Sequence, residues 1–329
     1  MKTQMMKKMF VSVVSLFALV GCGGNSDTAK PAISDTKPAS TFDTGKTIKV
    51  YTRDGTSGTR DGFMTKIGLE DAKSKNDLLV KTITEVSTNG NMVDAIKGDE
   101  YALGYISLAS LEESGLNGLK YDGVEPTTAN VLNKSYELTR NFNYIYRNDY
   151  GTDSKEKQIV EAFIAYTSTV EGKSIIQQKD GILEIKNTDK SWNDIKSNYP
   201  ITTMDNSRIT ITLGGSTSVE KIAKALTDAF KPLCGNFIAQ HNHTGSGDAY
   251  KHTQGAQKDD AGKLDIGFLS REINLTSTEP ASEGTYGKIC TDAIVAVVNS
   301  KNPYAETTAE VLKSIYTGEK TLWNQVIAA

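Results

Sequence analysis

The chain has 329 residues, of which 38% are hydrophobic and 23% are charged, as in globular proteins with roughly two domains. Its formal net charge of −3 excludes a broad electrostatic attraction to nucleic acid, which requires a basic surface. Any anion that this protein binds must therefore be held by a local site.

The N-terminus predicts a targeting segment followed by a tether. Two lysines precede an apolar run from Met9 to Cys22 that is too short to span a bilayer and has the form of a signal-peptide core. The run ends in Leu-Val-Gly-Cys, which resembles the lipobox of bacterial lipoproteins and implies lipidation of Cys22; an ordinary secretory signal is the alternative. Residues 23–45 are small and polar and predict a flexible tether, so the folded body is expected from residue 46.

Strands and helices alternate along the body. Periodicity predicts strands at 47–51, 101–108, 143–147, 209–213, 236–242, 264–270 and 290–300. It predicts helices from about 61, over about 154–178 and over 307–318, a turn followed by a helix over 214–230, and the opening of a helix at 244–253. A polar stretch at 191–207 predicts a connector between two units. The alternation indicates an α/β fold with parallel or mixed sheets.

Three loops share one design, in which a strand is followed by glycines and hydroxyls and then by a helix. They are Thr56–Thr59, Gly215–Ser218 and Thr244–Gly247. Helix N-termini carry unpaired N–H groups and a partial positive charge, and thus suit an oxyanion. One such loop could be an ordinary helix cap, but three of them, one close behind Arg53, predict an anion site. A guanidinium grips two oxygens at once, although Arg53 could instead pair with a nearby aspartate.

Several segments resemble the phosphate-binding proteins that feed ABC-type phosphate importers. They are "RDGTSGTRDGF", "YALGYISL", "YELTRNFNYIYR", "ITITLGGSTSVEKIAKAL", "LDIGFLSRE" and "AIVAVVNSKNP" with "EVLKSIYTGEKTLWNQV". The resemblance covers nearly the whole body. It implies a two-lobed, type II periplasmic-binding-protein-like fold with the ligand cleft between the lobes.

The order of these segments differs from the family order. In the family the Gly-Ser-Thr-Ser segment comes first and the arginine segment follows the Trp turn, whereas here the chain ends just after "LWNQV". Joining the end to residue 46 restores the order, so the chain resembles a circular permutant; a stitched gene model is the alternative. The predicted lobes are 46–145 plus 298–329, and 146–297.

The resemblance also implies roles for individual residues. Some family members have an aspartate, which accepts the phosphate proton, in the strand where this chain has Ser270. Asp54 is the candidate acceptor here, and Ser270 or a backbone carbonyl are alternatives. The implied phosphate-binding residues are Arg53, Ser57, Gly58, Thr59, Thr217, Ser218, Ser246 and Ser270.

Cysteines and histidines leave alternatives open. Cys234 and Cys290 could form a disulfide outside the cytoplasm or remain two free buried thiols. His241, His243 and His252 surround the third loop, where a metal site is less expected than polar surface histidines because no carboxylate or cysteine completes it.

The functional hypothesis is a monomeric, lipid-anchored extracytoplasmic protein that captures inorganic phosphate for the permease and ATPase subunits of an ABC importer. It predicts no cofactor, no nucleic-acid partner and no enzymatic activity. The alternatives are a binding protein for sulfate or molybdate, a secreted phosphatase or esterase that uses a loop serine, and an adhesin or sensor that keeps the fold without transport.

Overall fold

The computed structural model describes residues 42–327. The predicted signal peptide, Cys22 and most of the predicted tether lie outside these residues. Within 42–327, no helix combines the length and the apolar character needed to cross a bilayer. Phe42 packs against Tyr101 and Trp323 with ring centroids 4.9 and 5.8 Å away, so this residue belongs to the folded body and not to the tether.

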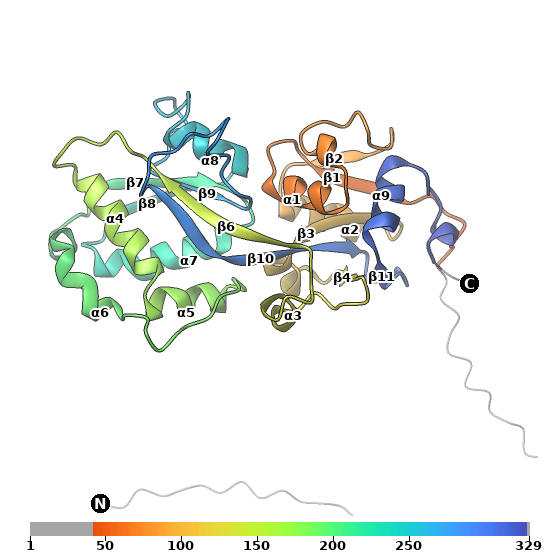
Figure 1. Cartoon of the computed structure of the whole chain (residues 1–329), viewed down its shortest axis with the longest axis horizontal. Helices are drawn as coiled ribbons and strands as arrows, with labels where there is room; N and C mark the ends of the chain where they lie inside the picture. Colours follow the sequence, from red (N-terminus) through yellow and green to blue (C-terminus); the bar gives the residue numbers. More distant parts are fainter. Residues whose placement is uncertain (1–41, 328–329) are drawn as a thin grey trace, which may run out of the picture. The chain divides into compact units, whose positions relative to one another are not determined.

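A nine-stranded mixed sheet runs through the body (Figure 1). Its order is β2-β1-β3-β10-β6-β9-β7-β8, with β4 also paired to β10. β1 is parallel to β2 and β3, and β7 is parallel to β8 and β9, whereas β10 is antiparallel to β3, β4 and β6. The mixed sheet confirms the predicted fold class. The strands are β1 (Lys49–Arg53), β2 (Thr84–Val86), β3 (Ala102–Ser107), β4 (Asn117–Gly118), β6 (Thr139–Tyr146), β7 (Thr210–Gly215), β8 (Ile238–Asn242), β9 (Ile266–Leu269) and β10 (Tyr286–Val298), and a separate pair is formed by β5 (Lys120–Tyr121) and β11 (Glu306–Thr307).

Helices flank the strands in both halves of the body (Figure 1). The helix predicted over 154–178 is two helices: the first ends at Thr167, and Thr169 caps the second by accepting a bond from the Gly172 N–H at 3.2 Å. α2, α3 and α6 were not predicted, and α6 lies in the stretch 191–207 that was expected to be a connector. The helices are α1 (Gly58–Lys66), α2 (Asn89–Gly98), α3 (Thr128–Leu132), α4 (Lys155–Thr167), α5 (Val170–Gln178), α6 (Trp192–Ile195), α7 (Glu220–Phe230), α8 (Ser246–Thr253) and α9 (Ala309–Thr317).

The two largest of four hydrophobic clusters form the cores of two lobes, and β6 and β10 cross between them (Figure 1). On β6 the core changes between Leu138 and Phe142, and on β10 it changes between Cys290 and Ala293. Both crossings lie several residues before the predicted boundaries. A continuous strand carries no turn residue at such a crossing, so the sequence does not mark its position.

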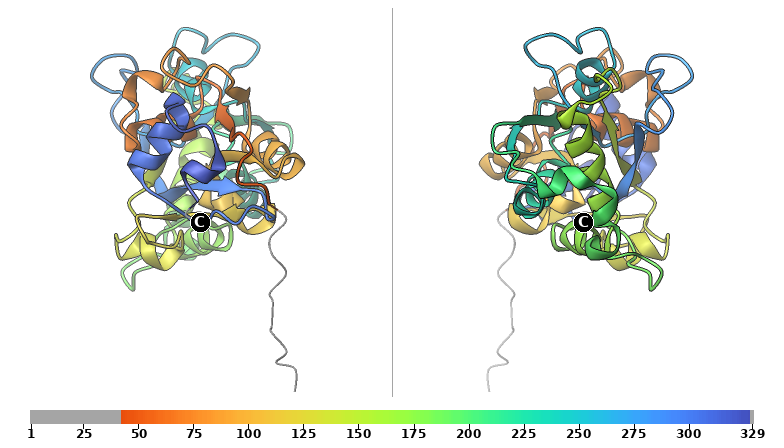
Figure 2. Two further views of the ribbon diagram at one scale, coloured as in Figure 1. Left: turned by 90° about the vertical axis from the view of Figure 1, so that its right-hand side faces the viewer. Right: turned by 90° about the vertical axis from the view of Figure 1, so that its left-hand side faces the viewer.

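The two ends of the described body lie side by side in the first lobe (Figure 2). The Ile48 N–H donates to the Thr321 carbonyl at 2.8 Å, and the Trp323 N–H donates to the Lys46 carbonyl at 3.1 Å. Adjacent ends at the surface are the condition under which a chain tolerates circular permutation. The permuted order remains a prediction, which this geometry supports.

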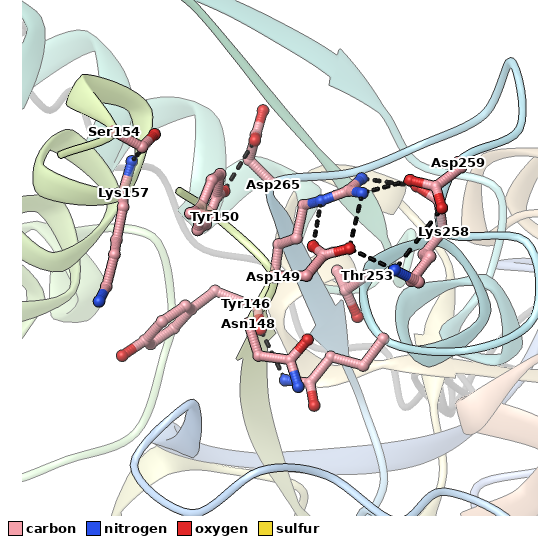
Figure 3. Close-up of polar contacts among 12 residues, drawn as sticks. Tyr146, Asn148, Asp149, Tyr150, Ser154, Lys157, Thr253, Lys258, Asp259 and Asp265 are labelled. Carbon is pink, nitrogen blue, oxygen red and sulfur yellow. Dashed lines mark hydrogen bonds and ion pairs between the residues drawn. The ribbon is translucent and has the colours of Figure 1, made fainter. Parts of the chain in front are cut away.

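A charged cluster joins the end of β6 to the loop after α8 (Figure 3). Arg147 pairs with Asp149 and Asp259, and Lys258 also bonds to Asp149. Exposed ion pairs each contribute little to stability, but a network of them holds two loops in one geometry. This cluster is therefore structural support for the second lobe.

Candidate oxyanion-binding site

The first predicted loop forms the N-terminus of α1. Ser57 is the N-cap, and its hydroxyl accepts a bond from the Arg60 N–H at 3.4 Å. Gly58 begins the helix, three residues before the predicted start. The N-terminal amides of α1 and its partial positive charge lie at this end, beside Arg53 at the end of β1.

Arg53 is a buried cation with incomplete hydrogen bonding. Its side chain donates to Asn89 Oδ1 at 3.0 Å, to the Ser87 carbonyl at 2.7 Å and to Thr217 Oγ1 at 3.2 Å. Its Nε is buried and has no partner among the described residues. Burial lowers the pKa of Arg53 to about 10, which leaves it protonated at neutral pH. No carboxylate forms an ion pair with it in the described part of the chain, so the alternative pairing with a nearby aspartate is not what the structure has.

The second predicted loop meets the first across the cleft. Thr59 Oγ1 lies 3.0 Å from Ser218 Oγ, and Arg53 reaches Thr217. Asn89, at the start of α2, donates to Ser218 Oγ at 3.0 Å. The lobes are thus closed on each other, with side chains from both in direct contact.

The third loop and the strand β9 complete this region. Ser246 Oγ and Ser270 Oγ are 3.1 Å apart, and the Ser270 N–H donates to Ser246 Oγ at 3.0 Å. Ser216 donates to Ser270 Oγ at 2.9 Å, which joins the second loop to the third. A Cβ atom on Gly58 would lie 2.5 Å from Ser246 Oγ and 2.7 Å from Ser270 Oγ, so α1 starts directly against these serines.

Two further charged residues lie here that the sequence did not single out. Arg140 on β6 pairs with Asp292 on β10, with Nε and Nη2 at 2.9 and 2.8 Å from Oδ2, and Nη2 also donates to Ser218 Oγ at 3.1 Å. Ser107 donates to the other Asp292 oxygen at 2.8 Å. A charged residue inside the apolar run of β10 was the available sign of this pair. We call the anion chamber the group formed by Arg53, Ser57, Gly58, Thr59, Asn89, Arg140, Ser216, Thr217, Ser218, Ser246 and Ser270.

Asp54 has a different environment. Its Oδ1 accepts a bond from the Thr56 N–H at 2.9 Å and one from the Thr56 hydroxyl, which holds the turn before α1. Its Oδ2 is buried and has no partner among the described residues. The role of Asp54 as proton acceptor remains a prediction.

His241 and His243 form a chain of hydrogen bonds behind the second loop. His243 Nδ1 lies 2.9 Å from the Ser216 carbonyl, its Nε2 lies 3.2 Å from His241 Nδ1, and His241 Nε2 lies 3.0 Å from Thr227 Oγ1. A carbonyl accepts only, so His243 Nδ1 carries the hydrogen of its bond to Ser216. Within residues 42–327, no three metal-ligating side chains come together. These half-buried histidines support the Ser216 loop.

We expect this histidine pair to make folding sensitive to acid. Burial lowers the pKa of His241 to about 4 from 6.5, and that of His243 is lowered for the same reason. Between these two values the unfolded chain binds more protons, so the free energy of unfolding should fall as the pH drops from about 6.5 to about 4. Urea unfolding at several pH values, with His241→Gln/His243→Gln alongside, measures this. If the free energy of unfolding of the double variant fell just as steeply over this pH range, the acid sensitivity would not come from these two rings.

Both cysteines of the described body are free, buried thiols. Cys234 follows α7 and Cys290 lies within β10, both in the core of the second lobe. Burial raises the pKa of Cys234 to about 11 and raises that of Cys290 as well, so neither is a ready thiolate at neutral pH. Of the two alternatives, the structure has the free thiols.

The fold and the chamber define a class of protein. Two α/β lobes are linked by crossing strands and close on a buried set of N–H and O–H donors, which is the architecture of a binding protein with a hinge. Residues 200–329 match the model of the PBP superfamily domain.

The chain is also similar in sequence and structure to individual phosphate-binding proteins. Phosphate-binding protein PstS 2 of Streptococcus agalactiae is 26% identical over 325 residues, covering 98% of this chain and 99% of the relative. Phosphate-binding protein PstS 2 of Streptococcus pneumoniae is 27% identical over 328 residues, covering 99% of this chain and 100% of the relative. A crystal structure of a phosphate-binding protein of a phosphate ABC transporter from S. pneumoniae matches with a TM-score of 0.60 and 26% identity, covering 86% of this chain and 100% of that one. Residues 200–329 are thus similar to the PBP superfamily domain, and the chain over nearly its whole length is similar to proteins named as phosphate-binding proteins.

Proposed function

We propose that this protein is the extracytoplasmic substrate-binding component of an ABC importer and that it captures inorganic phosphate in the anion chamber. Hydrogen-bond donors from both lobes replace water around the anion, and the crossing strands β6 and β10 permit opening and closure. Transport energy comes from the ATPase of the importer, because this sequence has no phosphate-binding P-loop motif.

One observation carries the proposal. Arg53 contacts Thr217 and Thr59 contacts Ser218, although these pairs are 164 and 159 residues apart in the chain. Such convergence of the first two loops from different lobes supports a shared ligand over unrelated helix caps. We propose that the predicted residues of both lobes donate to the anion and that Arg53 supplies a charge-assisted contact.

Binding is favoured over catalysis by the surroundings of the serines. A serine nucleophile needs a base within hydrogen-bond reach of its hydroxyl. In residues 42–327, His243 bonds to the carbonyl of Ser216 and not to its hydroxyl, and Ser246 and Ser270 bond to each other. These hydroxyls are arranged as donors, which is what an anion ligand requires.

We further propose that the mature protein is a monomer that is anchored through lipid on Cys22. The lipobox-like sequence carries this part of the proposal. A lipoprotein bears several acyl chains, and more than one chain is needed for stable attachment to a membrane. The anchor keeps the binding protein close to the permease.

Titration calorimetry of the chain without residues 1–22 tests the function. We expect one phosphate site, and no release of nitrophenol from p-nitrophenyl phosphate. Binding of sulfate without binding of phosphate would reassign the ligand. Turnover of the ester would favour the phosphatase alternative, and binding of neither anion would favour an adhesin or sensor.

A further inference from the structure

Arg140 resembles Arg53 in having guanidinium hydrogens with no protein acceptor. Its side chain is 4% exposed, and its Nε and Nη2 are engaged by Asp292 and Ser218. Its Nη1 is buried and has no partner among the described residues. An unpartnered donor on a buried cation costs free energy, so the site is arranged for an acceptor that the chain itself does not supply.

The two arginines are linked by a short chain of hydrogen bonds. Arg53 donates to Asn89, Asn89 donates to Ser218 Oγ, and Arg140 donates to the same oxygen, with donor–acceptor distances of 3.0, 3.0 and 3.1 Å. The charge of Arg140 is close enough to contribute to the lowering of the pKa of Arg53, although burial is the larger cause. Arg140 also lines a cavity of about 660 Å³ together with Ser57 and Ser270. The two cations are therefore joined through Asn89 and Ser218, and Arg140 faces this cavity.

The hydroxyls of the chamber are set to donate. Ser218 Oγ accepts from both Asn89 and Arg140, which occupies its lone pairs, so its own hydrogen goes to Thr59 Oγ1. The Thr59 hydrogen then stays available. Thr217 Oγ1 accepts from Arg53 and Ser57 Oγ accepts from the Arg60 N–H, and neither hydroxyl donates to another described residue.

On the other side of the anion chamber the serine hydroxyls also leave a hydrogen free to donate. Ser270 Oγ accepts from Ser216, and Ser246 Oγ accepts from the Ser270 N–H. Ser246 and Ser270 also share one bond, which uses one of their two hydrogens and leaves the other available. A carboxylate at position 270 would only accept, whereas the serine leaves this wall a donor as well.

From these observations we propose that Arg140 is a second cationic ligand of the bound anion, and that the chamber selects tetrahedral dianions over dihydrogen phosphate. The preferred ligands are then hydrogen phosphate and sulfate. This inference rests on the proposed function. Dihydrogen phosphate carries a second acidic proton that needs an acceptor, and it offers less negative charge to two buried guanidinium groups.

Asp54 is the rival to this inference, because its unpartnered Oδ2 could accept a ligand proton. Other ionisable groups lie near the two arginines. Arg53 interacts with Tyr105, Asp54 and Arg140, and Arg140 interacts with Asp292, Tyr105 and Asp61. Burial raises the pKa of Tyr105 and of Asp292, and lowers that of His243, which lies behind Ser216.

The pH dependence of anion affinity in the unmodified chain tests dianion selection. If only hydrogen phosphate binds, the apparent phosphate affinity should fall by about tenfold between about pH 8 and about pH 6, while sulfate affinity stays level because sulfate remains a dianion. Phosphate affinity that is level with pH would overturn the inference. If it then became pH-dependent in Asp54→Asn, Asp54 would be the acceptor.

A pair of double variants tests Arg140 itself. Arg140→Gln/Asp292→Asn removes both charges of the pair, so no carboxylate is left uncompensated. If Arg140 is a ligand, phosphate and sulfate affinity should fall by at least about tenfold; if it only neutralises Asp292, affinity should stay near that of the unmodified chain. The matched control is Arg271→Gln/Glu279→Gln, since Arg271 lines the same cavity but both its Nη atoms bond to Glu279.

Failure of the unmodified chain to bind phosphate would contradict the proposed function. Phosphate binding that is unaffected by pH and by the Arg140→Gln/Asp292→Asn variant would contradict this inference alone.

Discussion

Replacing Arg53 by alanine should weaken phosphate binding by at least about tenfold, because a buried charge-assisted contact to the anion is lost. The same change removes the bonds from the guanidinium to Asn89, Ser87 and Thr217, so part of the bridge between the lobes also disappears. Arg53→Lys should lose nearly as much, since an ammonium cannot reproduce the planar fork. Calorimetry with phosphate measures both variants.

The control for this prediction is folding. Each variant should show the same unfolding transition as the unmodified chain before its affinity is compared. Unchanged phosphate affinity in a folded Arg53→Ala protein would remove Arg53 from the site and with it the main support for the chamber.

Replacing Gly58 by alanine should weaken phosphate binding by about tenfold to a hundredfold while leaving the fold intact. The added Cβ would meet Ser246 Oγ at 2.5 Å and Ser270 Oγ at 2.7 Å. These serines are held by hydrogen bonds to each other and to Ser216, so they cannot turn aside without breaking those bonds. The methyl group therefore opposes closure of the lobes and not formation of the helix. Alanine is a better helix former than glycine, so the free energy of unfolding should be unchanged or higher.

Gly98→Ala is the matched control. Gly98 ends α2, and an added Cβ there meets no atom within 4 Å. Its phosphate affinity should equal that of the unmodified chain. If Gly58→Ala bound phosphate as tightly as Gly98→Ala does, the close approach of α1 to the serines would have no part in binding.

Local pattern predicted most of the elements that carry the chamber. β1, β7, β9 and the helices after the three loops lie close to their expected positions, because periodicity and cap residues are properties of a few neighbouring residues. The pattern over 154–178 was read as one helix, since the break at Thr169 leaves the apolar spacing almost unaltered. Short elements such as α3 were missed for lack of a periodic signal.

The motif "RDGTSGTR" contains two arginines, and the structure shows a physical difference between them. Arg60 donates to Ala72, Arg53, Glu85, Lys75 and Asn76, so protein acceptors engage every nitrogen of its guanidinium. Arg53 retains a buried Nε without a partner. Both are buried arginines within one short motif, and only their hydrogen-bond partners distinguish them.

The sequence by itself determined the α/β class, the positions of the three glycine- and hydroxyl-rich loops and the similarity to phosphate-binding proteins, because these depend on local periodicity and on short motifs. Only the tertiary structure decided that Asn89, Arg140 and Asp292 join those loops, that the histidines support Ser216, and where the strands cross between the lobes. These features are contacts between residues far apart in the chain. A single sequence carries no record of them, since the fold and not the spacing brings their side chains together.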